Sequence, residues 1–391
     1  MRLDGRLEGR SGRSGGVRRQ LHLLLHERRF RRGDRAERLR RKDHLLGDEG
    51  LERRGKGFGS GGVIRVTVRV KTPSRLHFAL IDLNGSLGRI DGSVGVALER
   101  PGFEIYLRKA EGVEVKGEGA GRFSDRIRRV IGRLRERFDI GGVEVEIKRH
   151  IPPHCGLGSG TQISLAVAYG AAALYGIDLS EEEAPLLVGR GGTSGIGVTA
   201  FHRGGFIIDG GHRFPDQKSS YLPSSASKDV PPPPVLLRTD FPEDWDILIV
   251  IPPGRHVSGE EEVRLFKRLC PIPACDVERL CRVILMEMLP ALIERDLEKF
   301  GDAVNRVQEI GWKRIEVEVQ DEVVRETMRF LRENGALGVG LSSWGPALYA
   351  FSENPEELLE KTEEFLGSSG GGGICLLSRA DNRGAVVERV G

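Results

Sequence analysis

A glycine-rich loop at residues 156–161 is the part of this sequence best suited to bind an anion. It reads Gly-Leu-Gly-Ser-Gly-Thr, comes shortly after two prolines, and lies between an expected strand and an expected helix. Glycine lets the backbone approach a ligand closely, and the first turn of a helix offers unpaired N–H groups to a phosphate. We therefore expect a phosphate cradle made of Gly156, Leu157, Gly158, Ser159, Gly160 and Thr161, whose hydroxyls could also hold a metal on the phosphate.

The loop differs from the two best-known nucleotide-binding loops. It lacks the Gly-Lys-Ser/Thr of a Walker loop, and it lacks the third glycine of a dinucleotide fingerprint because the helix opens with Thr-Gln. A tight strand-to-helix turn without a ligand is the alternative interpretation.

A second segment, residues 190–197, reads Arg-Gly-Gly-Thr-Ser-Gly-Ile-Gly. Its glycines and hydroxyls suit a second backbone-lined wall of the same site. We expect pyrophosphate or phosphate contacts from Gly191, Gly192, Thr193, Ser194 and Gly195.

The elements that must position these loops alternate without a regular strand–helix–strand rhythm, which indicates the α+β class. Residues 103–109 and 113–116 are expected to form a hairpin, and residues 125–138 an amphipathic helix with a basic face. Residues 143–149 form an expected strand before the loop, and residues 159–175 a buried helix after it.

The length of 391 residues favours two domains, and the composition, with 39% hydrophobic and 30% charged residues, is that of an ordinary soluble protein. No apolar run reaches the roughly 18 residues that a membrane-spanning helix needs, so a cytoplasmic location is expected. The five cysteines match no zinc-binding spacing.

The charge is unevenly distributed. Residues 1–62 contain 18 Lys and Arg against 9 Asp and Glu, whereas the remaining residues contain 42 against 48. Three interpretations of this basic segment stay open: an arm that binds nucleic acid, a disordered tail without a role, or an extension from a misassigned start codon. The abrupt change to strand-like alternation at Val63 favours the last.

The motifs resemble those of the GHMP kinase superfamily, which includes homoserine, mevalonate and galactose kinases. The resemblance covers most of residues 63–391 and rests on Pro-x-x-x-Gly-Leu-Gly-Ser, on Thr-Pro-Ser-Arg-Leu-His at 72–77, and on the glycine-rich segment 338–349. It implies a two-domain fold with a ribosomal S5 domain 2-like N-terminal domain and a ferredoxin-like C-terminal domain. The domains would span residues 63–216 and 235–391, joined by a flexible Ser- and Pro-rich linker at 217–234.

One position departs from the kinase pattern. The kinases carry a catalytic Asp in a segment reading roughly Ser-Gly-x-Asp, and Gly197 stands at that place here. The longer motifs, including Leu-Ile-Asp-Leu-Asn-Gly-Ser-Leu-Gly-Arg-Ile-Asp-Gly at 80–92, resemble instead the β-ribofuranosylaminobenzene 5′-phosphate synthases of archaeal methanopterin biosynthesis.

That resemblance implies a pentosyltransferase. Its reaction joins 5-phosphoribosyl 1-pyrophosphate to 4-aminobenzoate or 4-hydroxybenzoate and releases CO₂ and pyrophosphate. It implies a homodimer, a pyrophosphate leaving group held by the glycine loop, and Mg²⁺ as the cofactor, although the sequence does not identify the metal ligands.

Several residues are candidates for that chemistry, each beside a structural alternative. Arg75 and Arg89 could bind phosphate or the benzoate carboxylate, and Asp82 and Asp91 could form turns, hold Mg²⁺ or steady an arginine. His77 could donate to a phosphate or be a satisfied buried histidine. Trp344, with Ser342 and Ser343, could contact the aromatic acid or pack in the core.

Two competing functions are weighed against the pentosyltransferase. A small-molecule kinase of the same fold would turn over ATP, which Gly197 disfavours. A nucleic-acid-binding protein would use the basic segment 1–62, but the acidic remainder and the lack of an RNA-binding motif disfavour it. We therefore expect small-molecule substrates, with no nucleic acid and no membrane as partners.

Overall fold

The computed structural model describes residues 66–224, 226–227, 229–255, 257, 259–368 and 372–390. These residues belong to Val63–Gly391, one of two units into which the chain divides. The basic segment 1–62, with the three interpretations given above, lies outside the described residues.

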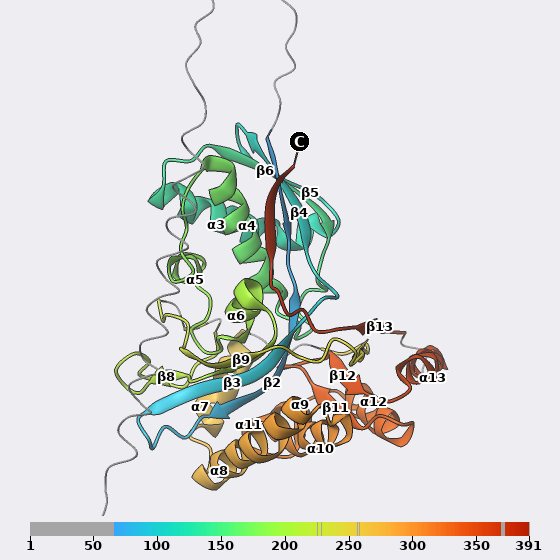
Figure 1. Ribbon diagram of the computed structural model, residues 1–391. Helices are drawn as coiled ribbons and strands as arrows, with labels where there is room; N and C mark the ends of the chain where they lie inside the picture. Colours follow the sequence, from blue (N-terminus) through green and yellow to red (C-terminus); the bar gives the residue numbers. More distant parts are fainter. Residues whose placement is uncertain are drawn as a thin grey trace, which may run out of the picture. The chain divides into compact units, whose positions relative to one another are not determined.

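The first sheet has the strand order β14-β1-β4-β6-β5. Its strands are β14 (Val386–Val390), β1 (Thr67–Lys71), β4 (Glu104–Ala110), β6 (Gly142–Arg149) and β5 (Val113–Gly117). Alternate residues such as Val68 and Val70 are fully buried, because successive side chains of a strand point to opposite faces. One face of this sheet is therefore covered, and helices α3 and α4 lie beside it (Figure 1).

The predicted hairpin of residues 103–109 and 113–116 is wrong in its pairing. Both strands form, but β6 lies between them: β4 pairs with β6 antiparallel, and β5 pairs with β6 parallel. A parallel pair needs a crossover, and α3 (Ala120–Arg137) supplies it between β5 and β6. The short link between β4 and β5 resembles a hairpin turn, so sequence alone could not reveal the insertion.

Two further sheets complete the α+β architecture. The second has the order β2-β3-β7-β9, with β8 paired to β3, and the third has the order β11-β12-β10-β13. Their strands are β2 (Ser74–Asp82), β3 (Arg89–Leu98), β7 (Phe206–Asp209), β8 (His212–Arg213), β9 (Val235–Thr239), β11 (Gly338–Leu341), β12 (Leu348–Phe351), β10 (Ile247–Ile251) and β13 (Ile374–Ser378).

The helices pack against these sheets (Figure 1). Those of the first half are α3, α4 (Ser159–Tyr175), α5 (Glu183–Val188) and α6 (Ile196–Arg203). Those of the second half are α7 (Glu260–Leu269), α8 (Ala274–Val283), the π-helical turn η1 (Ile284–Met288), α9 (Leu289–Glu294), α10 (Leu297–Gln308), α11 (Gly311–Glu318), α12 (Glu322–Glu333) and α13 (Pro355–Ser368). Within the described residues, no helix is long and apolar enough to cross a bilayer.

The two helices nearest the glycine loop show why the sequence folds this way. In α3 the apolar residues Phe123, Ile127, Val130, Ile131 and Leu134 recur every three or four positions and are buried, so its arginines lie on the other faces. In α4 small and apolar residues are buried on nearly all sides, and Gly176 ends the helix in the left-handed conformation.

The expected linker at 217–234 contains buried side chains, one of which contacts Asp91 on β3 of the second sheet. Lys218 and Ser227 are only 4% and 5% exposed. The division into domains at 63–216 and 235–391 stays a prediction.

Candidate functional site

The glycine loop adopts the conformation that its glycines allow. Gly156 and Gly158 have φ of 88° and 82°, and Gly158 is the N-cap residue before α4, which begins at Ser159. A side chain at Gly156 would overlap the backbone carbonyl oxygen of Ser342. The loop therefore lies directly against a segment almost two hundred residues later in the chain.

Three predicted motifs meet at this loop. Arg75 donates from its backbone N–H to Leu157 O at 3.2 Å and from Nη1 to Gly156 O. Ser342 donates its hydroxyl to Gly156 O at 2.7 Å and accepts from the backbone N–H of His77 at 3.1 Å. Ser342 is fully buried, so its role is to join the motifs.

A cleft of about 470 Å³ opens over the loop. Twelve of the residues predicted to act in catalysis or substrate binding line it: Arg75, His77, Gly156, Gly158, Ser159, Gly160, Thr161, Gly191, Thr193, Ser194, Ser343 and Trp344. Leu157, Gly192, Gly195 and Ser342 lie behind this surface rather than on it. Phosphate binding by the glycine loop and by residues 190–197 stays a prediction, but residues of both segments line one cleft.

Arginines dominate the side of the cleft near the loop. Arg122, Arg126 and Arg190 line it together with Arg75. Burial lowers the pKa of Arg75 to about 10, and burial, followed by repulsion from Arg129, lowers the pKa of Arg126. Guanidinium groups taken out of water are stabilised by an anion, so this side is suited to phosphate.

Sequence reasoning did not single out Arg122 and Arg126. They are four residues apart near the start of α3, so they share one face of the helix. Arg126 belongs to the predicted basic helix of residues 125–138, whereas Arg122 precedes it, because α3 begins at Ala120. The sequence did not show which cleft the basic face lines.

A hydrophobic cluster also lines the cleft through Leu80, Phe266 and Trp344, which together form its aromatic side. Trp344 is 4% exposed. The Trp344 ring meets that of Trp312 edge to face, at 5.6 Å between centroids and 85° between planes. Trp344 thus packs in a hydrophobic cluster and also lines the cleft. Its contact with the aromatic acid stays a prediction.

His77 also lines the cleft. Burial of its ring, followed by repulsion from Arg75 and Lys313, holds its pKa well below the usual value. The ring is therefore neutral at pH 7. His77 Nδ1 is buried and has no hydrogen-bond partner among the described residues.

A buried ion pair lies beneath the aromatic side. Lys313 is fully buried and pairs with Glu316, and its Nζ also donates to Leu341 O at 3.1 Å. Burial raises the pKa of Glu316, which also lines the cleft. Neither residue carried a recognisable signal in the sequence.

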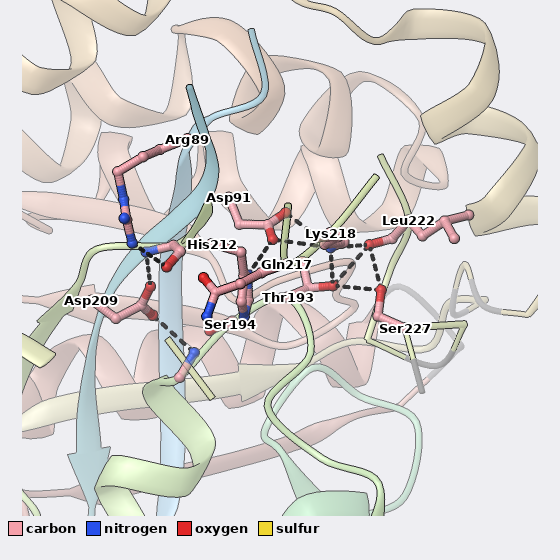
Figure 2. A network of polar contacts seen from close by, with 12 residues as sticks. Arg89, Asp91, Thr193, Ser194, Asp209, His212, Gln217, Lys218, Leu222 and Ser227 are labelled. Atoms are coloured by element: carbon pink, nitrogen blue, oxygen red, sulfur yellow. Dashed lines mark hydrogen bonds and ion pairs between the residues drawn. The ribbon is translucent and has the colours of Figure 1, made fainter. Parts of the chain in front are cut away.

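The second wall, residues 190–197, is held by a buried polar network (Figure 2). Lys218 Nζ donates to both carboxylate oxygens of Asp91, at 3.1 and 3.0 Å, and to Thr193 Oγ1 at 2.8 Å. His212 Nδ1 lies 2.7 Å from Asp91 Oδ2. Asp91 is fully buried, so its charge steadies a lysine and this wall.

A second buried carboxylate lies behind Ser194. Asp209 Oδ2 accepts from the Ser93 hydroxyl and from the backbone N–H of Gly195 at 2.9 Å, and Asp209 Oδ1 accepts from the N–H of Gly211 at 3.0 Å. Ser93 Oγ is 2.7 Å from Ser194 Oγ. Burial raises the pKa of Asp209 to about 6.

Asp82 and Arg89 lie away from the lining of the cleft. Asp82 Oδ1 accepts from the N–H groups of Asn84 and Gly85, at 2.8 and 3.1 Å, which supports the turn interpretation. Arg89 donates to Gly210 O and Gly211 O, at 2.8 and 2.7 Å (Figure 2). A direct substrate role for either residue stays a prediction.

Gly197 lines the cleft at the start of α6. A Cβ atom there would approach the Thr161 side chain at 3.3 Å, so a carboxylate at this position would face the glycine loop. The chain has only hydrogen at the position where the kinase resemblance places a catalytic acid.

In the described part of the chain, no group of three or more His, Cys, Asp or Glu side chains is arranged to hold a metal ion. The five cysteines form no disulfide.

Comparisons with known proteins agree with this geometry. Models of the GHMP kinases N-terminal domain and of the GHMP kinases C-terminal domain match residues 125–205 and 288–366. A solved mevalonate kinase structure superposes with a TM-score of 0.58 at 15% identity, over 81% of this chain and 99% of that one, which shows the fold.

Two curated relatives are much more similar. The β-ribofuranosylphenol 5′-phosphate synthase of Archaeoglobus fulgidus is 42% identical over 332 residues, which is 82% of this chain and 99% of that protein. The synthase of the same name from Methanothermobacter thermautotrophicus is 44% identical over 327 residues, which is 81% of this chain and 98% of that protein. The chain therefore belongs to the β-ribofuranosylphenol 5′-phosphate synthase family, built on the GHMP kinase fold.

Proposed function

We propose that this enzyme transfers the 5-phosphoribosyl group of 5-phosphoribosyl 1-pyrophosphate to 4-hydroxybenzoate or 4-aminobenzoate, with release of CO₂ and pyrophosphate. The relatives' name describes a ribofuranosylphenol phosphate, which is the product expected from 4-hydroxybenzoate. The observation that carries the proposal is the division of one cleft into an arginine-rich side and an aromatic side.

The two sides match the two substrates. The phosphoribosyl donor has anionic groups at both ends, and Arg75, Arg122, Arg126 and Arg190 line the side that includes the glycine loop. The acceptor is a flat aromatic acid, and Leu80, Phe266 and Trp344 offer apolar and aromatic surface of that kind.

The chemistry suits a site without a carboxylate at residue 197. As the bond to pyrophosphate breaks, the anomeric carbon becomes electron-poor, and the para hydroxyl or amino group pushes electron density into the ring. The ring carbon bearing the carboxylate forms the new C–C bond, and loss of CO₂ returns the electron pair to the ring. No base is needed to remove a ring proton, so the enzyme's part is positioning and stabilisation of the leaving anion.

A kinase function is the weaker candidate. A kinase of this fold would use a carboxylate at the position of Gly197, and glycine has no side chain to supply one.

Mg²⁺ is proposed as the cofactor. The hydroxyls of Ser159 and Thr161 line the cleft on the loop, where they fit an ion held mainly by phosphate oxygens and water. When bound, the ion would offset the negative charge of the departing pyrophosphate.

A homodimer is also proposed, because the family resemblance implies one. Leu285, Met286 and Ile293 are large apolar residues with 57%, 73% and 73% of their surface exposed, and they lie within ten residues of each other on η1 and α9. Exposed apolar surface of this kind is a frequent feature of faces that a second subunit covers.

The proposed reaction is tested by incubating the protein with 5-phosphoribosyl 1-pyrophosphate and carboxyl-labelled 4-hydroxybenzoate or 4-aminobenzoate. We expect labelled CO₂ in the presence of Mg²⁺ and none when the phosphoribosyl donor is omitted. A folded sample that releases no labelled CO₂ from either acid would overturn the proposal.

The arginine side predicts a selective effect on the donor. Arg126→Ala should raise the KM for 5-phosphoribosyl 1-pyrophosphate about 10- to 100-fold, since a hydrogen bond to a charged group contributes roughly 1.5–3 kcal/mol. The KM for the aromatic acid should change little.

Arg128→Ala is the matched control, because Arg128 is exposed on the same helix and donates to Val113 O, outside the cleft. Equal changes in both substrates' KM values for Arg126→Ala would argue against a phosphate contact.

A further inference from the structure

The direction of the hydrogen bonds behind the second wall is fixed by Asp209. An ionised carboxylate can only accept hydrogen bonds, so the Ser93 hydroxyl proton must point at Asp209 Oδ2. The backbone N–H groups of Gly195 and Gly211 also point at this carboxylate. Asp209 is 1% exposed, so water does not compete for these positions.

The direction is passed on to Ser194. Ser93 has one proton, and that proton is committed to Asp209. Ser93 must therefore accept at the 2.7 Å contact between the two hydroxyls, and Ser194 must donate. Of the two lone pairs of Ser194 Oγ, one accepts from the N–H of Ile196 at 3.3 Å and the other is left for the cleft, which Ser194 lines.

Thr193 is oriented in the same way. Its hydroxyl lies 2.8 Å from Leu222 O, and a carbonyl oxygen accepts, so Thr193 donates there. Lys218 Nζ donates to the same hydroxyl at 2.8 Å. Two consecutive hydroxyls of this wall thus donate to groups of the protein; Figure 2 shows the surroundings of Thr193.

A wall of this polarity is unsuited to hold a phosphate oxygen through its hydroxyls. Phosphate oxygens also accept hydrogen bonds, and the carboxylates of Asp209 and Asp91 lie behind the wall. The wall instead suits a ligand that donates. The sugar of 5-phosphoribosyl 1-pyrophosphate has two such donors, its 2- and 3-hydroxyls.

We propose that Ser194 Oγ accepts a hydrogen bond from a ribose hydroxyl of the phosphoribosyl donor, and that Ser93 and Asp209 orient Ser194 for this contact. The proposal rests on the proposed function for the identity of the donor. Ser194 is the residue that touches substrate, whereas Ser93 and Asp209 are positioning residues. The anionic ends of the donor are then left to the arginine side, and the sugar bridges the two walls.

The contact has a chemical consequence for the reaction. A 2-hydroxyl that donates to Ser194 gains electron density on its oxygen, next to the carbon that becomes electron-poor as pyrophosphate leaves. A hydrogen bond to this hydroxyl strengthens in a transition state of oxocarbenium character. Ser194 therefore favours ribosyl over deoxyribosyl donors and contributes to the rate.

The test combines Ser194→Ala with 2-deoxy and 3-deoxy analogues of the donor. With the ribosyl donor, Ser194→Ala should lower kcat/KM about 10- to 100-fold. With the analogue that lacks the contacted hydroxyl, wild type and variant should have nearly equal kcat/KM. If Ser194→Ala lowers kcat/KM equally with all three donors, the proposal is overturned in favour of a structural role. If that equal loss disappears at high Mg²⁺ concentration, it is overturned in favour of a metal ligand.

Binding separates this proposal from the proposed function. If the wild type does not release CO₂, calorimetry with ribose 5-phosphate and its 2-deoxy and 3-deoxy analogues still measures the contact. Wild type should prefer ribose 5-phosphate over one of the two analogues about 10-fold or more, and Ser194→Ala should abolish that preference. Equal affinities of the wild type for all three sugar phosphates would overturn the contact. Ser124→Ala is the control, because Ser124 donates to Ala120 O within α3 and lies outside the cleft.

The positioning residues are tested by a pH profile. Burial raises the pKa of Asp209 to about 6, with a smaller contribution from Asp91, whose own charge faces Lys218 and His212. Arg89 faces the carbonyls of Gly210 and Gly211 on the other side. Above pH 6 Asp209 is ionised, so the Ser93 hydroxyl donates to Asp209 and the Ser194 hydroxyl donates to Ser93. Below pH 6 Asp209 is protonated and can donate to Ser93. Ser93 can then donate to Ser194, whose own proton is no longer committed to Ser93.

We therefore expect the preference for ribosyl over deoxyribosyl donors to fall as the pH drops through about 6. Asp209→Asn should flatten this profile, and Ser93→Ala should weaken the preference at every pH. A preference that stays constant in the wild type from pH 5 to 8 would contradict the orienting role.

Discussion

Gly156→Ala is expected to lower the free energy of unfolding by roughly 2–6 kcal/mol and to lower kcat/KM at least 100-fold. The new Cβ would overlap the Ser342 carbonyl oxygen, and φ of 88° is a conformation that alanine rarely adopts. The loop must shift, and both Arg75 and Ser342 bind its Gly156 carbonyl. Urea denaturation and steady-state kinetics measure the two effects.

Alanine substitutions at two other glycines distinguish the cost of steric overlap from the cost of backbone strain. Gly176 also has positive φ, at 72°, but a Cβ there meets nothing within 4 Å, so Gly176→Ala should cost only about 1 kcal/mol. Gly132 lies inside α3 with open space and should tolerate alanine with a gain of about 0.5–1 kcal/mol. If Gly156→Ala costs no more than Gly176→Ala, close packing of the loop on Ser342 is not what holds this site together.

The sequence predicted the parts of this site that depend on local conformation. The glycine loop, the buried helix after it and the α+β class follow from residue types and periodicity over short stretches. The resemblance then indicated that Arg75, His77 and the segment around Trp344 belong together, and the structure joins them through Gly156 and Ser342.

The parts that sequence reasoning did not find depend on contacts between distant residues. Lys218 lies in a segment that reads as a linker, and its burial depends on contacts such as the ion pair with Asp91, 127 residues away. The position of β6 between β4 and β5 also depends on a long-range contact, because a β4–β5 hairpin and the observed pairing of both strands with β6 would satisfy the same kind of backbone groups. The motif of Arg89 predicted contact with a phosphate or with the benzoate carboxylate; the structure shows Nε and Nη2 donating to two carbonyls, and the substrate contact stays a prediction.

Asp91→Asn is expected to destabilise the protein by about 3–5 kcal/mol, because it leaves the buried ammonium of Lys218 without its counter-charge. Asp91 is fully buried and Lys218 is 4% exposed. Asparagine keeps the shape of the side chain and tolerates φ of 70°, so the loss reports the charge and not the backbone. Glu357→Gln is the matched control: it breaks the exposed pair with Lys361 and should cost at most about 0.5 kcal/mol.

The double variant Asp91→Asn/Lys218→Met distinguishes the ion pair from the rest of the network. Removing both charges leaves no uncompensated ion, so the double variant should be at least about 2 kcal/mol more stable than Asp91→Asn alone. The double variant should have lower activity than the wild type, because Thr193 loses its hydrogen bond from Lys218, which helps hold residues 190–197 at the cleft. A double variant no more stable than Asp91→Asn would show that His212 and Thr193, rather than the Lys218 charge, account for the burial of Asp91.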